Sequence, residues 1–359
     1  MKITRVELVP FALHFKRPYV TARGTLQRRE MVLAKLLTDQ DLVGLGEAVP
    51  VTLRGGELGA VLGDLERLRG VLEEADASPA KIPSLLERCA SLNPGTPAMA
   101  AVDMALLDLS AKHAGRPAWE LHGATKVQPV RCNATLVAGA PQEVAADAAD
   151  WASHGFNTFK LKVGARDDDA AGVAAVRDAI GPEAKIRIDA NGAWSTEQAI
   201  DWLARLEQHG IELAEQPTAT LHQLALVRAA TDVALAADES VASEQDAGRA
   251  VQLQACDYVT VKLAKTGGSV RTRNIAATLP TYLSSALDGP VGIAAAAHLA
   301  QVMPDIGLAH GLATQALFAE WPVRAGARLE GDMLLPSDAP GLGVELDEQA
   351  LSDFRLDVS

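Results

Sequence analysis

Five charged residues recur at a regular interval in the second half of the chain: Lys162, Asp189, Glu215, Asp238 and Lys262. They lie in the runs "TFKLKVG", "RIDANG", "LAEQP", "AADES" and "VTVKLAK", at steps of 23 to 27 residues. Such a step fits one strand plus one helix, so each residue is expected at the C-terminal end of a successive parallel strand. If the sheet closes into a barrel, these strand ends meet at one mouth.

Three of the five are carboxylates, Asp189, Glu215 and Asp238. Carboxylates gathered in one pocket cannot all stay ionised unless a cation lies among them. Oxygen ligands suit Mg2+, and the lack of His or Cys at these positions argues against zinc. Taken singly, Asp189 and Asp238 are equally expected to cap a following helix. The prediction that all three bind Mg2+ rests on their position, because each occurs at the same point of a successive strand–helix unit.

The lysines can do acid–base chemistry beside such a metal. Lys160 and Lys162 point to the same face of their strand, which alone would also suit a solvated edge strand. Crowding by Lys160, the metal and desolvation are expected to lower the pKa of Lys162, so that it removes a proton α to a metal-bound carboxylate. Lys262 lies on the other side of the metal. Asn191 and Glu239 are predicted to orient the metal ligands.

Composition excludes some classes of partner. The 359-residue chain has a net charge of −13, which argues against nucleic acid or an anionic membrane as partner. The predicted metal and lysine chemistry points to a small carboxylate substrate, and a homo-oligomer is left open. No signal peptide or membrane-spanning run is evident, so a cytoplasmic enzyme is expected. Cys89, Cys132 and Cys256 are far apart and are predicted to be reduced core residues.

Three segments must position these residues. Residues 1–125 show strands and then helices, typical of an α+β capping domain. Residues 126–323 alternate seven strand-like runs with helices, which favours a closed (β/α) barrel over an open sheet, since no GxGxxG or Walker motif opens a unit. Residues 324–359 are loop-rich with one short strand and are expected to return to the capping domain.

With "KLK", "DAN", "EQP", "DES" and "VKLAKTGG" in this order, the chain resembles the enolase superfamily, muconate-cycloisomerase subgroup, over nearly its whole length. The resemblance implies an α/β fold, a (β/α)7β TIM-like barrel with an α+β cap. It also implies Asp189, Glu215 and Asp238 as Mg2+ ligands. Lys162 and Lys262 would be acid/base groups on opposite faces of the substrate.

The subgroup includes several reactions. The segment "YLSSALDGPVG" resembles o-succinylbenzoate synthases, which favours a lyase, the dehydratase of menaquinone synthesis. Ser284 and Ser285, with the next helix N-terminus, would then bind a remote substrate carboxylate, unless they only cap the turn. An N-acylamino acid racemase, dipeptide epimerase or muconate cycloisomerase on the same metal site stays open, although "DIGLAHGLATQALFAE" lacks the Asp-x-Asp expected for a dipeptide's ammonium. A catalytically inactive scaffold conflicts with the filled charged positions.

Two loops are expected to close over the barrel mouth and set specificity, residues 17–27 and 49–58. Arg23 and Arg54 in these loops would meet an anionic substrate, or would only keep the loops soluble. The connection from Lys262 to Ser284 is short for the family, which raises the question of whether Ser284 is correctly placed.

Overall fold

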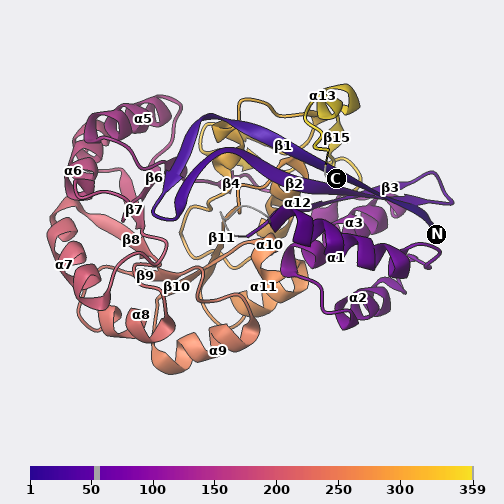
Figure 1. Cartoon of the computed structure of the whole chain (residues 1–359), viewed down its shortest axis with the longest axis horizontal. Helices are drawn as coiled ribbons and strands as arrows, with labels where there is room; N and C mark the ends of the chain where they lie inside the picture. The colour runs from indigo at the N-terminus through magenta and orange to yellow at the C-terminus, as the bar shows by residue number, and fades with distance from the viewer. Residues whose placement is uncertain (52–56, 358–359) are drawn as a thin grey trace.

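The computed structural model describes residues 1–51 and 57–357. Its first part is a three-stranded antiparallel sheet of β1 (Ile3–Thr21), β2 (Gly24–Thr38) and β3 (Val43–Ala48). Strands β1 and β2 pair along their length, down to Thr21 opposite Gly24. The long hairpin therefore ends in the two-residue turn Ala22–Arg23, and Figure 1 shows it reaching across to the barrel beside β6 (Thr158–Lys162).

Helices α1 (Glu57–Leu72) and α3 (Thr96–His113) pack on this sheet. Helix α2 (Ile82–Ser91) packs on α1 and α3, and α4 (Ala118–Leu121) packs on α3 and α12 (Pro290–Ala300). Helix α3 lies directly on β3, where a Cβ on Gly44 or Gly46 would overlap the carbonyl oxygens of Ala105 or Ala101. Because both glycines lack a side chain, the two backbones approach closely. The expected α+β cap is confirmed.

A parallel sheet of seven strands forms the second part, in the order β11-β10-β9-β8-β7-β6-β5. Besides β6, its strands are β5 (Ala134–Leu136), β7 (Lys185–Asp189), β8 (Ile211–Glu215), β9 (Leu235–Ala237), β10 (Tyr258–Val261) and β11 (Thr281–Leu283). Each lies within one of the seven strand-like runs of the sequence. Figure 1 shows this sheet curled, with helices around its outside, so the predicted TIM-like architecture is confirmed.

Five α-helices lie on the outside of the sheet between β5 and β10. They are α5 (Pro141–Ser153), α6 (Asp169–Ile180), α7 (Thr196–Leu206), α8 (Leu221–Arg228) and α9 (Glu244–Leu253). The side chains of Ser195, Thr220 and Ser243 accept hydrogen bonds from the backbone three residues later, at the starts of α7, α8 and α9. Each cap satisfies an amide that has no partner within its helix.

Irregular backbone completes the barrel. Between the two sheet edges, Gly311 N donates to Leu283 O at 2.8 Å and His310 N donates to Arg131 O at 2.8 Å. This segment therefore bonds to both sides of the opening. The short connection after Lys262 is made of α10 (Leu263–Thr266) and α11 (Ser269–Ala276), and it still places Ser284 N 2.7 Å from Val261 O.

The C-terminal part contains more strands than predicted. They are β12 (Val323–Ala325), β13 (Arg328–Glu330), β14 (Met333–Leu335) and β15 (Glu345–Leu346), with β4 (Val130–Arg131) pairing with β14. The prediction of one strand was wrong because runs of two or three residues are too short to show alternation. Helix α13 (Glu348–Asp353) follows, and Lys35 on β2 pairs with Glu348 at 2.5 Å, so this segment contacts the cap.

The three cysteines and the Ala-rich run of the sequence lie in the core. Cys89, Cys132 and Cys256 are buried and free, as expected. Helix α12 (Pro290–Ala300), which contains the Ala-rich run, is buried at all but its last residue. Within the described residues, no helix combines the length and apolarity needed to cross a membrane.

Candidate active site

The structure brings the five periodic residues to one end of the barrel. Lys162, Asp189 and Glu215 are the last residues of β6, β7 and β8, and Lys162 and Asp189 are partners in register, as are Asp189 and Glu215. Asp238 and Lys262 directly follow β9 and β10. The C-terminal ends of five consecutive strands therefore supply the site, as expected for this architecture.

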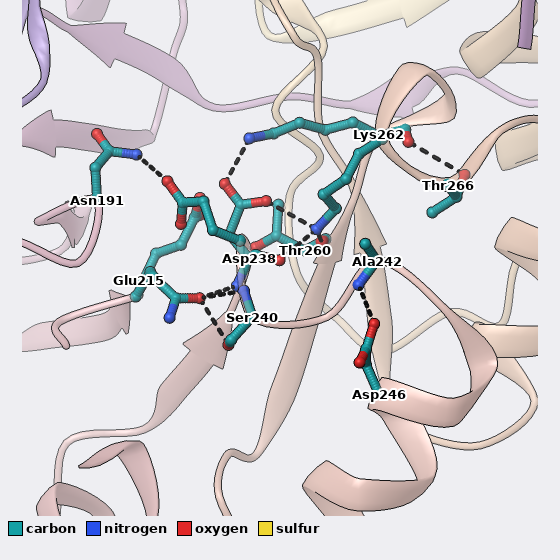
Figure 2. Close-up of polar contacts among 12 residues, drawn as sticks. Asn191, Glu215, Asp238, Ser240, Ala242, Asp246, Thr260, Lys262 and Thr266 are labelled. Carbon is teal, nitrogen blue, oxygen red and sulfur yellow. Dashed lines mark hydrogen bonds and ion pairs between the residues drawn. The ribbon is translucent and has the colours of Figure 1, made fainter. Parts of the chain in front are cut away.

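Buried ion pairs link the lysines and carboxylates. Lys160 Nζ lies 2.9 Å from Asp189 Oδ2 and 2.7 Å from Glu215 Oε1, and Lys162 Nζ lies 2.6 Å from Asp189 Oδ2. Lys262 Nζ lies 2.5 Å from Asp238 Oδ2, and Figure 2 shows its side chain extended toward that carboxylate. The three carboxylates are at most 1% exposed. Lysine charges therefore balance carboxylates that would otherwise be too costly to bury.

These pairs control protonation at the site. Burial alone would raise the pKa of Asp189, but Lys160 and Lys162 bring it well below its usual range. Burial acts to lower the pKa of Lys162, but negative groups, chiefly Asp189, raise it above its usual value. Here the attraction of Asp189 exceeds the repulsion from Lys160, and the lowering of the Lys162 pKa stays a prediction for the metal-loaded site.

Three residues that the sequence analysis missed complete the polar network. Lys265 Nζ lies 2.9 Å from Asp238 Oδ1 and donates to Thr260 O at 2.7 Å. Gln216 Oε1 accepts from Asp238 N at 2.7 Å. Tyr282 donates its hydroxyl proton to Glu215 Oε2 at 2.6 Å. Lys265 in "VKLAKTGG" is the one with a sequence signal, since it follows Lys262 at helical spacing.

Asn191 and Glu239 lie beside the carboxylates and contact the cap. Asn191 Nδ2 donates to Glu239 Oε1 at 3.0 Å, and its Oδ1 accepts from Lys162 at 3.2 Å (Figure 2 draws the first contact). Arg23, in the hairpin turn, pairs with Glu239 at 3.1 Å and donates to Asn191 O at 3.1 Å. The hairpin is thereby held over the mouth. Arg54 lies outside the described residues.

Of the two predicted substrate-binding serines, Ser285 is already engaged. Ser285 Oγ accepts from Asp288 N at 2.8 Å and from Thr314 Oγ1 at 2.9 Å, which is a turn-stabilising role. An added Cβ on Gly311 would lie 2.6 Å from Ser284 Oγ, so the Ser284 hydroxyl faces the neighbouring backbone. Ser285 still lines the central cavity with Lys162 and Lys262.

The start of α12 has a protein partner from the cap. Glu47, on β3, accepts from Gly289 N at 2.6 Å and from Val291 N at 3.4 Å. The expectation that this helix N-terminus helps to bind a remote substrate carboxylate was therefore wrong, because Glu47 already takes the amides. Burial, and then repulsion from Asp288, raise the pKa of Glu47 to about 8.

The carboxylates of the site supply the kind of donor atom that a metal ion needs. The donor atoms of Asp189, Glu215 and Asp238 are all carboxylate oxygens of buried side chains. Glu239 Oε2 is also buried, and it has no hydrogen-bond partner among the described residues. This chemistry fits a hard divalent cation. Among the described residues, no group of three or more His, Cys, Asp or Glu side chains is arranged so that it could hold a metal ion. Lys160 lies between Asp189 and Glu215, and Lys262 lies against Asp238.

Comparison with known proteins covers almost the whole chain. Residues 143–350 match the family model "Enolase C-terminal domain-like", and residues 3–123 match "Mandelate racemase / muconate lactonizing enzyme, N-terminal domain". The L-Ala-D/L-Glu epimerase of Clostridium acetobutylicum is 33% identical over 96% of this chain and 99% of its own length. The o-succinylbenzoate synthase of Thermobifida fusca is 38% identical, over 64% of this chain and 71% of its own length.

A solved structure is similarly close. The dipeptide epimerase of Cytophaga hutchinsonii, complexed with Mg and the dipeptide D-Ala-L-Val, superposes with a TM-score of 0.92 at 30% identity, covering 98% of both chains.

Proposed function

Because the chain belongs to the mandelate racemase / muconate lactonizing enzyme family of the enolase superfamily, we propose that it is a divalent-metal-dependent racemase or epimerase. Its substrate would be an N-acylated amino acid, a class that includes the C-terminal residue of a dipeptide. The observation that carries the proposal is that Lys162 and Lys262 line one cavity from β6 and β10, with three strands between them.

The lysines would divide the proton transfer between them. The neutral amine of Lys162 takes the proton from the α-carbon on one face and becomes an ammonium, and the Lys262 ammonium gives a proton to the other face. In the reverse direction the roles exchange. Two bases on opposite sides of one carbon are what inversion of that carbon requires.

Asp189, Glu215 and Asp238 would hold the metal. When bound, a divalent cation supplies positive charge that stabilises negative charge developing on the substrate carboxylate and favours the neutral amine of Lys162. Lys160, Asn191 and Glu239 would orient these groups through the contacts described above. Arg23 would keep the hairpin over the mouth and limit the access of water.

A second candidate is the dehydratase that forms o-succinylbenzoate. It is favoured by the "SSALDG" segment and by the Thermobifida relative, although that match is partial. It is opposed by the engaged Ser285 and by Glu47 at the start of α12. In this reaction Lys262 would act only as a fixed cation, so Lys262→Arg should retain more turnover than Lys262→Ala.

Proton exchange in D2O separates the candidates. NMR would follow a panel of N-acyl amino acids, dipeptides and the o-succinylbenzoate precursor with the Mg2+-loaded protein. Fast exchange at the α-carbon of an N-acyl amino acid, with racemisation, is the expected result. Dehydration of the precursor without such exchange would instead establish the second candidate.

A further inference from the structure

A second cavity, of about 350 Å³, shares the side chain of Tyr19 with the central cavity of the candidate active site. The central cavity at Lys162 and Lys262 has about 80 Å³. Sites for small molecules usually measure about 300–1,000 Å³, so the central cavity can hold the reacting carbon and its carboxylate but not a large substituent. The second cavity has the missing volume.

Tyr19 forms part of the wall of both cavities. It is buried and lies on β1 of the cap hairpin. On the barrel side, the second cavity is lined by Thr135, whose partner in the sheet is Lys160. The larger cavity therefore begins next to the catalytic lysine strand and runs outward between the hairpin and α5.

The walls are aromatic. Phe15 and Tyr19 stack with their ring centroids 5.4 Å apart, and Trp151 meets Phe156 edge to face at 4.6 Å. One pair comes from the cap and the other from the end of α5 and the turn after it. Such walls favour flat or branched apolar groups, because rings stack and exclude water.

The rim carries balanced charge. Arg17 on β1 pairs with Asp147 on α5 at 2.6 Å, and Lys16 and Asp150 add one further charge of each sign. A rim without net charge gives no preference for an ionised tail. The walls and the rim together select an uncharged apolar group.

We propose that this second cavity is a specificity subsite that takes an uncharged, ring-bearing or branched side chain of the substrate. The inference rests on the proposed function, since it assigns the side chain of the amino acid whose α-carbon lies between Lys162 and Lys262. It predicts that N-acylated aromatic amino acids are better substrates than N-acylated alanine.

Filling the cavity tests the proposal. Ala316, in the 3-10 helix Ala313–Leu317, lines the second cavity and is absent from the catalytic contacts. The test compares wild type, Ala316→Phe and the control Ala204→Phe, which adds the same ring to the exposed face of α7. Calorimetry would give the affinity of the Mg2+-loaded proteins for N-acetylalanine and N-acetylphenylalanine, and NMR in D2O would give α-proton exchange.

Wild type and Ala204→Phe should prefer N-acetylphenylalanine by about 10-fold or more, the gain expected from burying a ring. Ala316→Phe should lose that preference and keep its affinity for N-acetylalanine. Leu329→Ala, which enlarges the cavity from β13, should shift preference toward N-acetyltryptophan, so the test survives if Ala316→Phe misfolds.

The two proposals fail separately. Exchange on both compounds with no preference in wild type, or with the same preference in Ala316→Phe, would overturn the subsite and leave the racemase. A binding preference that Ala316→Phe removes, without exchange on any compound, would uphold the subsite and overturn the racemase.

Discussion

The hydroxyl of Tyr282 donates to Glu215 Oε2 at 2.6 Å, while Lys160 holds the other oxygen of the same carboxylate at 2.7 Å. Tyr282 and Glu215 are both about 1% exposed. The orientation of Glu215 is therefore fixed from β11 and β6 at once. A carboxylate held in this way is preorganised for a ligand that needs one of its oxygens.

Tyr282→Phe should weaken metal binding by about 10- to 100-fold, because it removes the hydroxyl that orients Glu215. The ring and its contact with Arg187, 5.4 Å from the ring centroid, should remain. Calorimetric titration with Mg2+ measures the effect without substrate. Tyr258→Phe is the control, because Tyr258 is the first residue of the neighbouring strand β10 and Lys262 of the site follows the last. Equal Mg2+ affinity in Tyr282→Phe and wild type would show that the hydroxyl does not serve the metal site.

Mg2+ should stabilise the wild-type protein against thermal unfolding, and EDTA should reverse the effect. A ligand present at 100 times its Kd stabilises by about 2.7 kcal/mol. Asp238→Asn should abolish the response and should also lower the stability of the metal-free protein by roughly 3–5 kcal/mol, because Lys262 and Lys265 lose their buried partner. Asp246→Asn, in the first turn of α9, should respond like wild type. If the Tm of the wild-type protein were the same with and without Mg2+, the proposed metal site would be refuted.

Stability should fall as pH rises from about 4.5 to about 8, through the titration of Glu47. Its pKa in the folded protein is about 8, against a usual value of 4.5, so the folded state binds more protons in this window. The stabilisation is complete below pH 4.5 and is lost as pH rises through 8. Glu47→Gln keeps an acceptor for Gly289 N and removes the titration.

Urea unfolding at several pH values measures this effect. Other groups titrate alike in both proteins, so the difference between the wild-type and Glu47→Gln curves isolates Glu47. That difference should change by on the order of 3 kcal/mol between pH 4.5 and 7, in favour of the variant at high pH. Asp288 is the facing acid and Arg29 the facing cation in this region. Parallel curves would mean that Glu47 has the same pKa in the folded and the unfolded protein.

The sequence predicts the barrel and the five periodic residues well for a physical reason. Parallel strands buried on both faces give apolar runs, and a charge at the end of such a run is conspicuous. Lys160 in "TFKLKVG" shows this, since two lysines in a buried strand require buried anions nearby. Asp189 and Glu215 supply them.

Contacts made by tertiary packing were not predictable. Glu47 meets Gly289 across 242 residues of sequence, so nothing local to "LDGPVG" indicates that the helix N-terminus is covered. The helical spacing of Lys265 from Lys262 is visible in the sequence, but its buried contact with Asp238 Oδ1 at 2.9 Å is visible only in the fold. The sequence likewise favoured the dehydratase, whereas relatives that match over their full length favour the alternative.

The central claim is that Lys162 and Lys262 act on opposite faces of one carbon. The most direct test is α-proton exchange of the separate L and D forms of an N-acyl amino acid, in D2O with Mg2+, by wild type, Lys162→Ala and Lys262→Ala. Wild type should exchange both forms. Each variant should lose about 10²- to 10⁴-fold in exchange of one form, a different form for each lysine, and keep exchange of the other. If both variants exchanged the α-proton of both forms at the wild-type rate, that result would contradict the account.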